Sequence, residues 1–292
     1  MKIGKKDNLK VWVSIGFLLF LVVFFLAIFL LGKQKPVTIV SFLDVGQGDS
    51  IFIEAPNGNQ VLIDAGPNAG VIQELSKVIP FWDRTIDMII PTHADKDHIA
   101  GFPEVLKRYK VQSIYDTSNQ ATTAIYGEYT ARRDEEKSPI RIASSLDTIV
   151  LDSKEHVYLR VLYPDPGMEE QNLERNDNST IIQLVYGDIQ VMLTGDVGVM
   201  VENYLVYKYG GFLESEILKA GHHGSKTSSS PLFLQTVNPS YVVVSAGENN
   251  QYGHPHQEVI QEIQTIGAQM LETSKEGTIS FVIDGTNIWR KK

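Results

Sequence analysis

Apolar and polar residues alternate along most of this chain in short runs, separated by turns that contain glycine, proline or asparagine. Period-two alternation and runs of β-branched residues predict strands, and apolar residues at helical spacing predict helices. We expect strands at 37–43, 49–54, 60–64, 86–90, 157–162, 180–186, 189–193, 217–220, 241–246 and 278–283. We expect helices at 71–79, 100–109, 120–136, 197–207, 231–236 and 257–266. This order predicts a layered α/β domain with sheets inside and helices outside.

The first residues show a different pattern. Residues 11–31 form an apolar run without charge, which as a helix is long enough to cross a bilayer core of about 30 Å. A cleaved signal peptide is disfavoured, because its apolar region is shorter and ends at a small-residue cleavage site. We therefore expect a cytoplasmic tail at 1–10, a single-pass transmembrane anchor at 11–31, a linker at 32–36 and one domain at 37–292. More lysines precede the run than follow it, so the positive-inside rule predicts a cell-membrane protein whose domain faces outward.

Composition narrows the chemistry that this domain can perform. The chain contains no cysteine, which excludes disulfides, thiolate metal sites and a cysteine nucleophile. Any metal ion must therefore be held by histidines and carboxylates. The net charge of −9 counts against non-specific binding of nucleic acid, because neutralisation of phosphates drives such binding.

The strongest chemical signal is the segment Thr92-His93-Ala94-Asp95-Lys96-Asp97-His98, which follows the strand expected at 86–90. Two imidazoles and two carboxylates fall within six residues at the end of a strand, where loops carry active sites. Divalent ions such as Zn²⁺ and Mn²⁺ bind this set of nitrogen and oxygen ligands. The segment therefore predicts a metal site.

Two later motifs also follow expected strands. Asp196 alone would be interpreted as a turn residue or a helix N-cap, but beside the first cluster it fits a carboxylate that bridges two metal ions. The adjacent residues His222 and His223 are flanked by glycines. Consecutive side chains there point in different directions, so we expect only one of the two to bind metal. The sequence does not decide which.

Three weaker motifs complete the candidate site. Pro255 constrains His254 to an extended conformation. The segment 176–179, Asn-Asp-Asn-Ser, is typical of an Asx turn. Asp44 and Asp49 lie in a glycine-rich segment that we interpret as a tight turn with carboxylates near the site.

Six motifs, FLDVGQGDS, THADKDH, NDNS, LTGD, KAGHHGS and YGHPH, resemble in this order the metallo-β-lactamase superfamily, over about residues 37–285. They are most similar to its ComEC-type branch, the carboxy-terminal hydrolase domain of competence proteins. The common superfamily motif is H-x-H-x-D-H, and Asp95 stands here at the second histidine, as in that branch. The resemblance implies an αββα sandwich with a site for two divalent metal ions, Zn or Mn.

By position, the resemblance implies that His93, Asp95 and Asp196 hold one metal. It implies that Asp97, His98 and Asp196, with His222 or His223, hold the other. The histidine that superfamily members add in a third motif is missing here, and Asp177 or Asn178 would stand in its place.

The expected activity is hydrolysis by a metal-activated water. Asp97 would act as the base or orient the water, and His254 would stabilise the transition state. Ser225, Lys226 and Asn178 would contact the substrate. A phosphodiester is the leading substrate, with DNA as the specific expectation and a separate DNA-uptake channel protein as a partner.

Other functions stay open at this point. A cell-wall phosphoesterase or another hydrolase on the same fold is one alternative. A non-catalytic metal-binding sensor or scaffold is the other. A β-lactam substrate is disfavoured, because Asp95 replaces an imidazole.

Overall fold

The computed structural model describes residues 5–31, 35–118, 120–165 and 176–291. The chain divides into two compact units, Met1–Pro36 and Val37–Lys292, and each is described here by itself. The first unit consists of the helix α1 (Lys5–Leu31). Most of the linker predicted at 32–36 and the start of the tail predicted at 1–10 lie outside the described residues.

The structure contradicts the predicted location in the cell membrane. A spanning helix needs about 20 consecutive, predominantly apolar residues. Among the described residues, no helix combines enough length and apolar character to cross a membrane. The anchor predicted at 11–31 is therefore not confirmed, although a helix does form over that segment.

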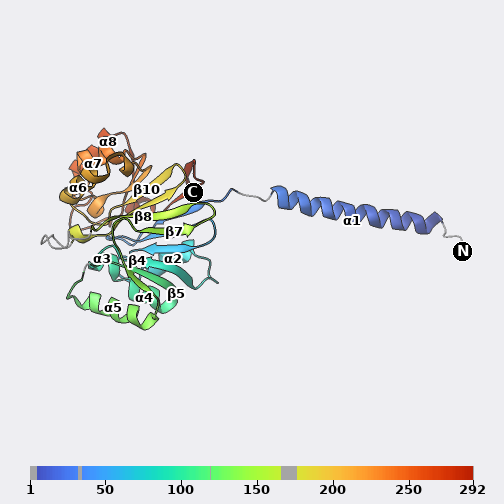
Figure 1. Cartoon of the computed structure of the whole chain (residues 1–292), viewed down its shortest axis with the longest axis horizontal. Coiled ribbons are helices and arrows are strands. Elements are labelled where there is room, and N and C mark those ends of the chain that lie inside the picture. Colours follow the sequence, from blue (N-terminus) through green and yellow to red (C-terminus); the bar gives the residue numbers. More distant parts are fainter. Residues whose placement is uncertain (1–4, 32–34, 119, 166–175, 292) are drawn as a thin grey trace. The chain divides into compact units, whose positions relative to one another are not determined.

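The second unit is built on two sheets (Figure 1). The first has eight strands, in the order β15 (Ile288–Lys291), β14 (Ile279–Ile283), β1 (Thr38–Phe42), β2 (Ile51–Glu54), β3 (Gln60–Ile63), β4 (Thr85–Ile90), β5 (Lys110–Asp116) and β6 (Ile140–Ile142). The second has seven, in the order β13 (Gln269–Glu272), β12 (Tyr241–Val244), β11 (Ile217–Lys219), β10 (Ile189–Leu193), β9 (Ile181–Tyr186), β8 (Val157–Tyr163) and β7 (Thr148–Asp152).

Helices cover the outer face of each sheet (Figure 1). The first sheet carries α2 (Val71–Val78), α3 (Lys96–Ile99), α4 (Phe102–Arg108) and α5 (Ala124–Glu136). The second carries α6 (Val199–Tyr209), α7 (Pro231–Val237) and α8 (Gln257–Thr265). One apolar core fills the space between the sheets, and a further core lies under each layer of helices. The layered α/β arrangement predicted from the sequence is therefore confirmed.

Parallel pairing explains why the polar motifs meet. In the first sheet β3, β4 and β5 are parallel, and in the second β10, β11, β12 and β13 are parallel. Carboxyl ends of parallel strands lie at one edge of a sheet, which is where ligands bind in open α/β folds. The two edges are joined by a hydrogen bond of 2.8 Å, which the backbone N–H of Thr180 donates to the carbonyl of Thr92.

Candidate metal centre

Four side chains converge at this edge. Asp97 and His98 lie on α3, directly after β4, whereas Asp196 follows β10 and His223 follows β11. One ligand atom from each of the four lies within 4.8 Å of those from the others. The structure therefore brings together residues from three separate motifs.

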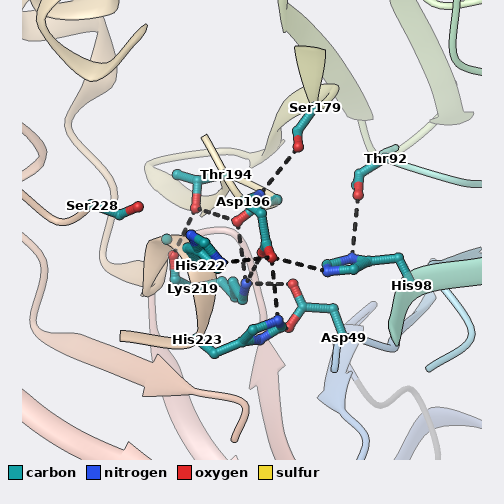
Figure 2. A network of polar contacts seen from close by, with 12 residues as sticks. Asp49, Thr92, His98, Ser179, Thr194, Asp196, Lys219, His222, His223 and Ser228 are labelled. Atoms are coloured by element: carbon teal, nitrogen blue, oxygen red, sulfur yellow. Dashed lines mark hydrogen bonds and ion pairs between the residues drawn. The ribbon is translucent and has the colours of Figure 1, made fainter. Parts of the chain in front are cut away.

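The carboxylate of Asp196 is at the centre of this group (Figure 2). Its Oδ2 lies 3.2 Å from Nε2 of His98 and 3.2 Å from Nε2 of His223. The same nitrogen of His223 lies 3.2 Å from Oδ2 of Asp97. All these atoms face a common point, as ligands of one cation would.

His93 and Asp95 lie beside this group. Nε2 of His93 is 4.0 Å from Oδ2 of Asp95, and the ring of His93 is centred 4.0 Å from the ring of His98. His93 is fully buried, so its ring cannot turn outward into solvent. The pair is thus placed to extend the ligand set on the side of His93.

Asp64 and Thr92 fix the orientation of the two buried imidazoles. Nδ1 of His98 lies 2.7 Å from Oδ2 of Asp64, and Nδ1 of His93 lies 3.1 Å from Oγ1 of Thr92. The hydroxyl of Thr92 in turn donates to Asp64 at 2.7 Å. Because a carboxylate only accepts hydrogen bonds, it holds the proton of His98 on Nδ1 and leaves Nε2 with a lone pair.

The remaining nitrogens fit a metal ion. Nε2 of His93 is buried and has no hydrogen-bond partner, and Nε2 of His98 lies against the carboxylate of Asp196. A buried polar atom without a partner is unfavourable, and a bound cation would satisfy Nε2 of His93. The donor set of imidazoles and carboxylates is also the set that Zn²⁺ and Mn²⁺ prefer.

A buried ammonium lies on the opposite side of Asp196. Lys219 is fully buried and pairs with Oδ2 of Asp49 (Figure 2). Its Nζ lies 3.4 Å from Oδ1 of Asp196, and it donates a hydrogen bond of 3.2 Å to the carbonyl of Gly195. Oδ1 of Asp49 lies 3.3 Å from Nδ1 of His223. Lys219 thus contacts Asp196, and Asp49 contacts His223, so the two residues hold two of the candidate ligands in place.

The pKa values report a strongly negative pocket. Burial alone would lower the pKa of His98, but the carboxylates of Asp196 and Asp64 raise it well above its ordinary value. Burial also opposes ionisation of Asp196, yet the charges of His223 and His98 hold its pKa well below its usual range. In contrast, burial and the charge of His98 lower the pKa of His93. The pocket therefore favours positive charge, supplied by protons or by metal ions.

Comparison with known proteins agrees with this geometry. Residues 43–248 match the model of the metallo-beta-lactamase superfamily. The chain belongs to this superfamily.

Its relatives are competence proteins, as the sequence motifs predict. ComE operon protein 3 of Bacillus subtilis is 30% identical over 259 residues, which cover 83% of this chain and 32% of that protein. Competence protein ComA of Neisseria gonorrhoeae is 31% identical over 246 residues, with coverage of 83% and 32%. The chain thus spans about a third of the length of these relatives. The metallo-beta-lactamase fold protein YhfI of Bacillus subtilis shares the fold, with a TM-score of 0.53 at 11% identity, over 81% of this chain and 96% of that one.

As a metallo-beta-lactamase superfamily member, the chain has the fold of metal-dependent hydrolases, which binds divalent metals, and its structure contains candidate clusters of histidines and aspartates. The sequence leaves His222 and His223 undistinguished, whereas the structure separates them. His223 is buried against Asp49, Asp97 and Asp196. His222 is 31% exposed, and its Nε2 lies 3.9 Å from Oδ2 of Asp196. Both residues have left-handed backbone angles, with φ of 46° and 56°, which turn the two rings apart.

The metal cluster opens into a pocket of about 120 Å³. His254 lines it, together with Asp95, Asp97 and His222. Nδ1 of His254 is buried without a hydrogen-bond partner. Burial and the charges of His223 and His222 lower the pKa of His254 to about 4. The imidazole is therefore neutral near pH 7 and faces the same space as the cluster.

The three predicted substrate contacts lie elsewhere. Asn176 lines the metal pocket, whereas Asn178 is not among its lining residues in the described part of the chain. Ser225 is buried, and its Oγ lies 3.0 Å from Oγ1 of Thr227. Lys226 lines a different pocket, beside Glu258. The roles predicted for Ser225, Lys226 and Asn178 stay predictions.

Two functional residues were missed at the level of sequence. Asp64 directly follows the strand β3 and was given no role, and Lys219 was quoted only as part of its motif. A signal for Asp64 is present, because a carboxylate directly after a buried strand is typical of active-site edges. Asp49, interpreted from the sequence as a carboxylate near the site, does lie in the network of Figure 2.

Proposed function

We propose that this domain is a metal-dependent phosphodiesterase that hydrolyses DNA. The observation that carries the proposal is the position of Asp196. One oxygen of its carboxylate is 3.2 Å from Nε2 of both His98 and His223, which would hold one metal ion, and the resemblance to the superfamily shares this carboxylate with a second ion at His93 and Asp95. Hydrolases with two metal ions use such a shared carboxylate to hold the ions about 3.5–4 Å apart.

The ligand assignment follows the resemblance to the superfamily, with His223 preferred over His222 because His223 is buried in the cluster. His93, Asp95 and Asp196 would hold one metal ion, and the second would be held by Asp97, His98, Asp196 and His223. When bound, such ions supply Lewis acidity and lower the pKa of water toward neutrality. The resemblance to the superfamily gives Zn or Mn as the ions.

Asp97, besides its role as a ligand, and His254 would act on the reacting groups. The pKa of Asp97 is lowered, because hydrogen bonding to His223 and the charge of His98 outweigh burial. A carboxylate with a low pKa is a weak base, so Asp97 orients the water and does not keep its proton. His254 is neutral near pH 7 and presents a polar ring to the pocket. It is placed to hydrogen-bond a phosphoryl oxygen of the substrate.

The choice of DNA is supported by the relatives, whose names refer to competence and recombination. The negative net charge of the chain does not oppose this choice at the site itself, because two divalent ions would reverse the local potential. Association with a separate DNA-uptake channel protein stays a prediction.

The experiment measures hydrolysis by the full chain with Mn²⁺ or Zn²⁺. Single-stranded DNA, double-stranded DNA and bis-p-nitrophenyl phosphate are offered to the wild type, to Asp97→Ala and to Asp134→Ala. Asp134 is an exposed carboxylate on α5 and serves as the matched control. We expect cleavage of DNA and of the small diester that is lost with EDTA and in Asp97→Ala but kept in Asp134→Ala.

Two other results would redirect the proposal. Cleavage of the small diester without DNA would keep the phosphodiesterase and favour a cell-wall phosphoester as the substrate. Stoichiometric metal with no hydrolysis of any substrate would favour a sensor and contradict the proposal.

A further inference from the structure

A second and larger pocket opens beside the metal centre. Its volume is about 420 Å³, within the range of roughly 300–1,000 Å³ of small-molecule sites. Gln47, Asp97 and Tyr252 line both this pocket and the pocket of the metal cluster. The two spaces are therefore neighbours that share a wall. A chemical group bound in the larger pocket lies next to a bond that is held at the cluster.

Tyr252 offers a flat aromatic surface at this wall. Its ring lies 5.6 Å from the ring of His254 and is inclined to it by 24°, so one face of the tyrosine is packed on the histidine. The residue is nevertheless 55% exposed. A ring that is packed on a second ring by one face and exposed by the other is oriented for stacking on a flat ligand.

Apart from Pro67, the other residues that line this pocket have polar side chains, and one of them is a carboxylate. Gln47, Asn249 and Gln251 contribute side-chain amides, a group that can donate and accept hydrogen bonds. The amide of Asn250 instead holds the loop, because it bonds to the backbone of Gly247, Tyr252 and His254. Lys96 contributes a cation in a chain with a net charge of −9. Asp97 is the lining carboxylate, and it already belongs to the metal cluster. The pocket thus combines a stacking surface, amides and a positive charge.

A nucleotide has matching chemistry. Its base has a flat face for an aromatic ring and an edge of hydrogen-bond donors and acceptors for amides, and its phosphate attracts a lysine. We propose that this pocket is a nucleoside subsite, in which Tyr252 stacks on the base next to the phosphodiester bond at the metal centre. The proposal rests on the proposed function, because it names the part of a DNA substrate that this pocket receives.

The first test measures binding to the full chain loaded with Mn²⁺. Thymidine 5′-monophosphate, inorganic phosphate and glucose 1-phosphate are titrated by calorimetry. We expect the nucleotide to bind about 5- to 150-fold more tightly than inorganic phosphate, the ratio that corresponds to ~1–3 kcal/mol of stacking per base. Tyr252→Ala removes this advantage and Tyr252→Phe keeps it. Tyr207→Ala, a change of a tyrosine that is 92% exposed on α6, also keeps it.

Three results of this titration would overturn the subsite. The first is a nucleotide that binds no more tightly than inorganic phosphate. The second is an equal advantage for glucose 1-phosphate, which would show a carbohydrate subsite. The third is an advantage that survives in Tyr252→Ala.

The second test separates the subsite from the proposed function. Wild type and Tyr252→Ala are given thymidine 5′-(p-nitrophenyl phosphate) and methyl p-nitrophenyl phosphate, which lacks a nucleoside. We expect Tyr252→Ala to lower kcat/KM for the thymidine ester at least about fivefold more than for the methyl ester. If neither ester is hydrolysed while the binding advantage holds, the proposed function fails and the subsite stands. If the wild type hydrolyses both esters without preferring the nucleoside, the phosphodiesterase stands and the subsite is rejected.

Discussion

The two oxygens of the Asp196 carboxylate have different partners, and Lys219 is the partner of one of them. Nζ of Lys219 lies 3.4 Å from Oδ1 of Asp196, whereas Oδ2 of the same side chain lies 3.2 Å from Nε2 of His98 and 3.2 Å from Nε2 of His223. The ammonium therefore fixes the carboxylate by one oxygen and leaves the other to face the cluster. Residues around a metal site orient its ligands through contacts of this kind.

We expect Lys219→Met to destabilise the metal-free chain. Methionine keeps much of the aliphatic volume but removes the charge, so Asp49 and Asp196 lose their buried cationic partner. Loss of one partner of a buried ion pair destabilises a protein by about 3–5 kcal/mol. Added Mn²⁺ recovers part of this loss, because it binds the folded state. Urea unfolding with EDTA and with Mn²⁺ measures both effects.

The matched control for this variant is Lys154→Met. Lys154 is 87% exposed and pairs with Glu155 on the surface, so its removal changes stability by only about 0–1 kcal/mol. A Lys219→Met variant as stable as this control would show that Lys219 does not support the carboxylates.

We expect Asp64→Asn to weaken metal binding with little change of fold. Asp64 accepts a hydrogen bond from Nδ1 of His98 at 2.7 Å, and this bond keeps Nε2 of His98 available as a ligand. Removal of such a partner typically lowers metal affinity about 10–100-fold. Calorimetric titration with Mn²⁺ measures the change. Asp87→Asn changes a carboxylate of the same sheet that contacts Gln60 and Gln112 instead of the cluster, and it should bind as the wild type does.

The fold was predicted where apolar runs are long enough to show a period. Of the strands missed, β13 (Gln269–Glu272) and β15 (Ile288–Lys291) are short and contain only two apolar residues each, too few to distinguish a strand from a loop. Both exist because a neighbouring strand supplies hydrogen bonds: β12 pairs with β13, and β14 pairs with β15. β5 (Lys110–Asp116) was missed because polar residues interrupt it directly after α4. Strand pairing is a tertiary property, which a single short run does not contain.

The candidate site, like the fold, could be predicted only in part from the sequence. Its local clusters could be predicted, because several ligand-type residues within a few positions of a strand end are informative by themselves. The partnership of Asp64 with His98 could not, because 34 positions separate them and only the parallel pairing of β3 with β4 brings them together. The choice between His222 and His223 depends on left-handed backbone angles, which the motif does not reveal.

We expect Gly48→Ala to disturb the metal centre through the backbone of Asp97. At Gly48 φ is +137°, and a Cβ there would lie 2.2 Å from the carbonyl oxygen of Asp97. The backbone of α3 around Asp97 would have to move, and the Asp97 side chain would move with it. Gly58→Ala is the control, because Gly58 also has a positive φ of +87° but open space around it. Both variants lose about 1–3 kcal/mol to backbone strain, and only Gly48→Ala should also lose affinity for Mn²⁺. Equal metal binding by the two variants would contradict this account of Gly48.

Glu202, which is not a candidate metal ligand, gives a test of how stability depends on pH. It is fully buried on α6 and accepts hydrogen bonds from the backbone N–H groups of Ser229 and Ser230, in the loop that follows the two histidines. Burial raises the pKa of Glu202 above its ordinary value of 4.5, although these hydrogen bonds oppose the shift. A carboxyl with a raised pKa in the folded state contributes stability that is complete below the unfolded pKa. That contribution is lost as the pH rises through the folded pKa.

We therefore expect the difference in unfolding free energy between wild type and Glu202→Gln to shrink as the pH rises from about 5 toward neutrality. A difference of about 1–3 kcal/mol should persist at neutral pH, because glutamine accepts from one N–H and leaves the other buried without a partner. Urea unfolding of the metal-free proteins at several pH values measures both quantities. Glu128→Gln, an exposed change on α5, should match the wild type throughout. A difference that grows with pH would mean that the folded state lowers the pKa of Glu202, because only then would stability be gained as the carboxyl ionises.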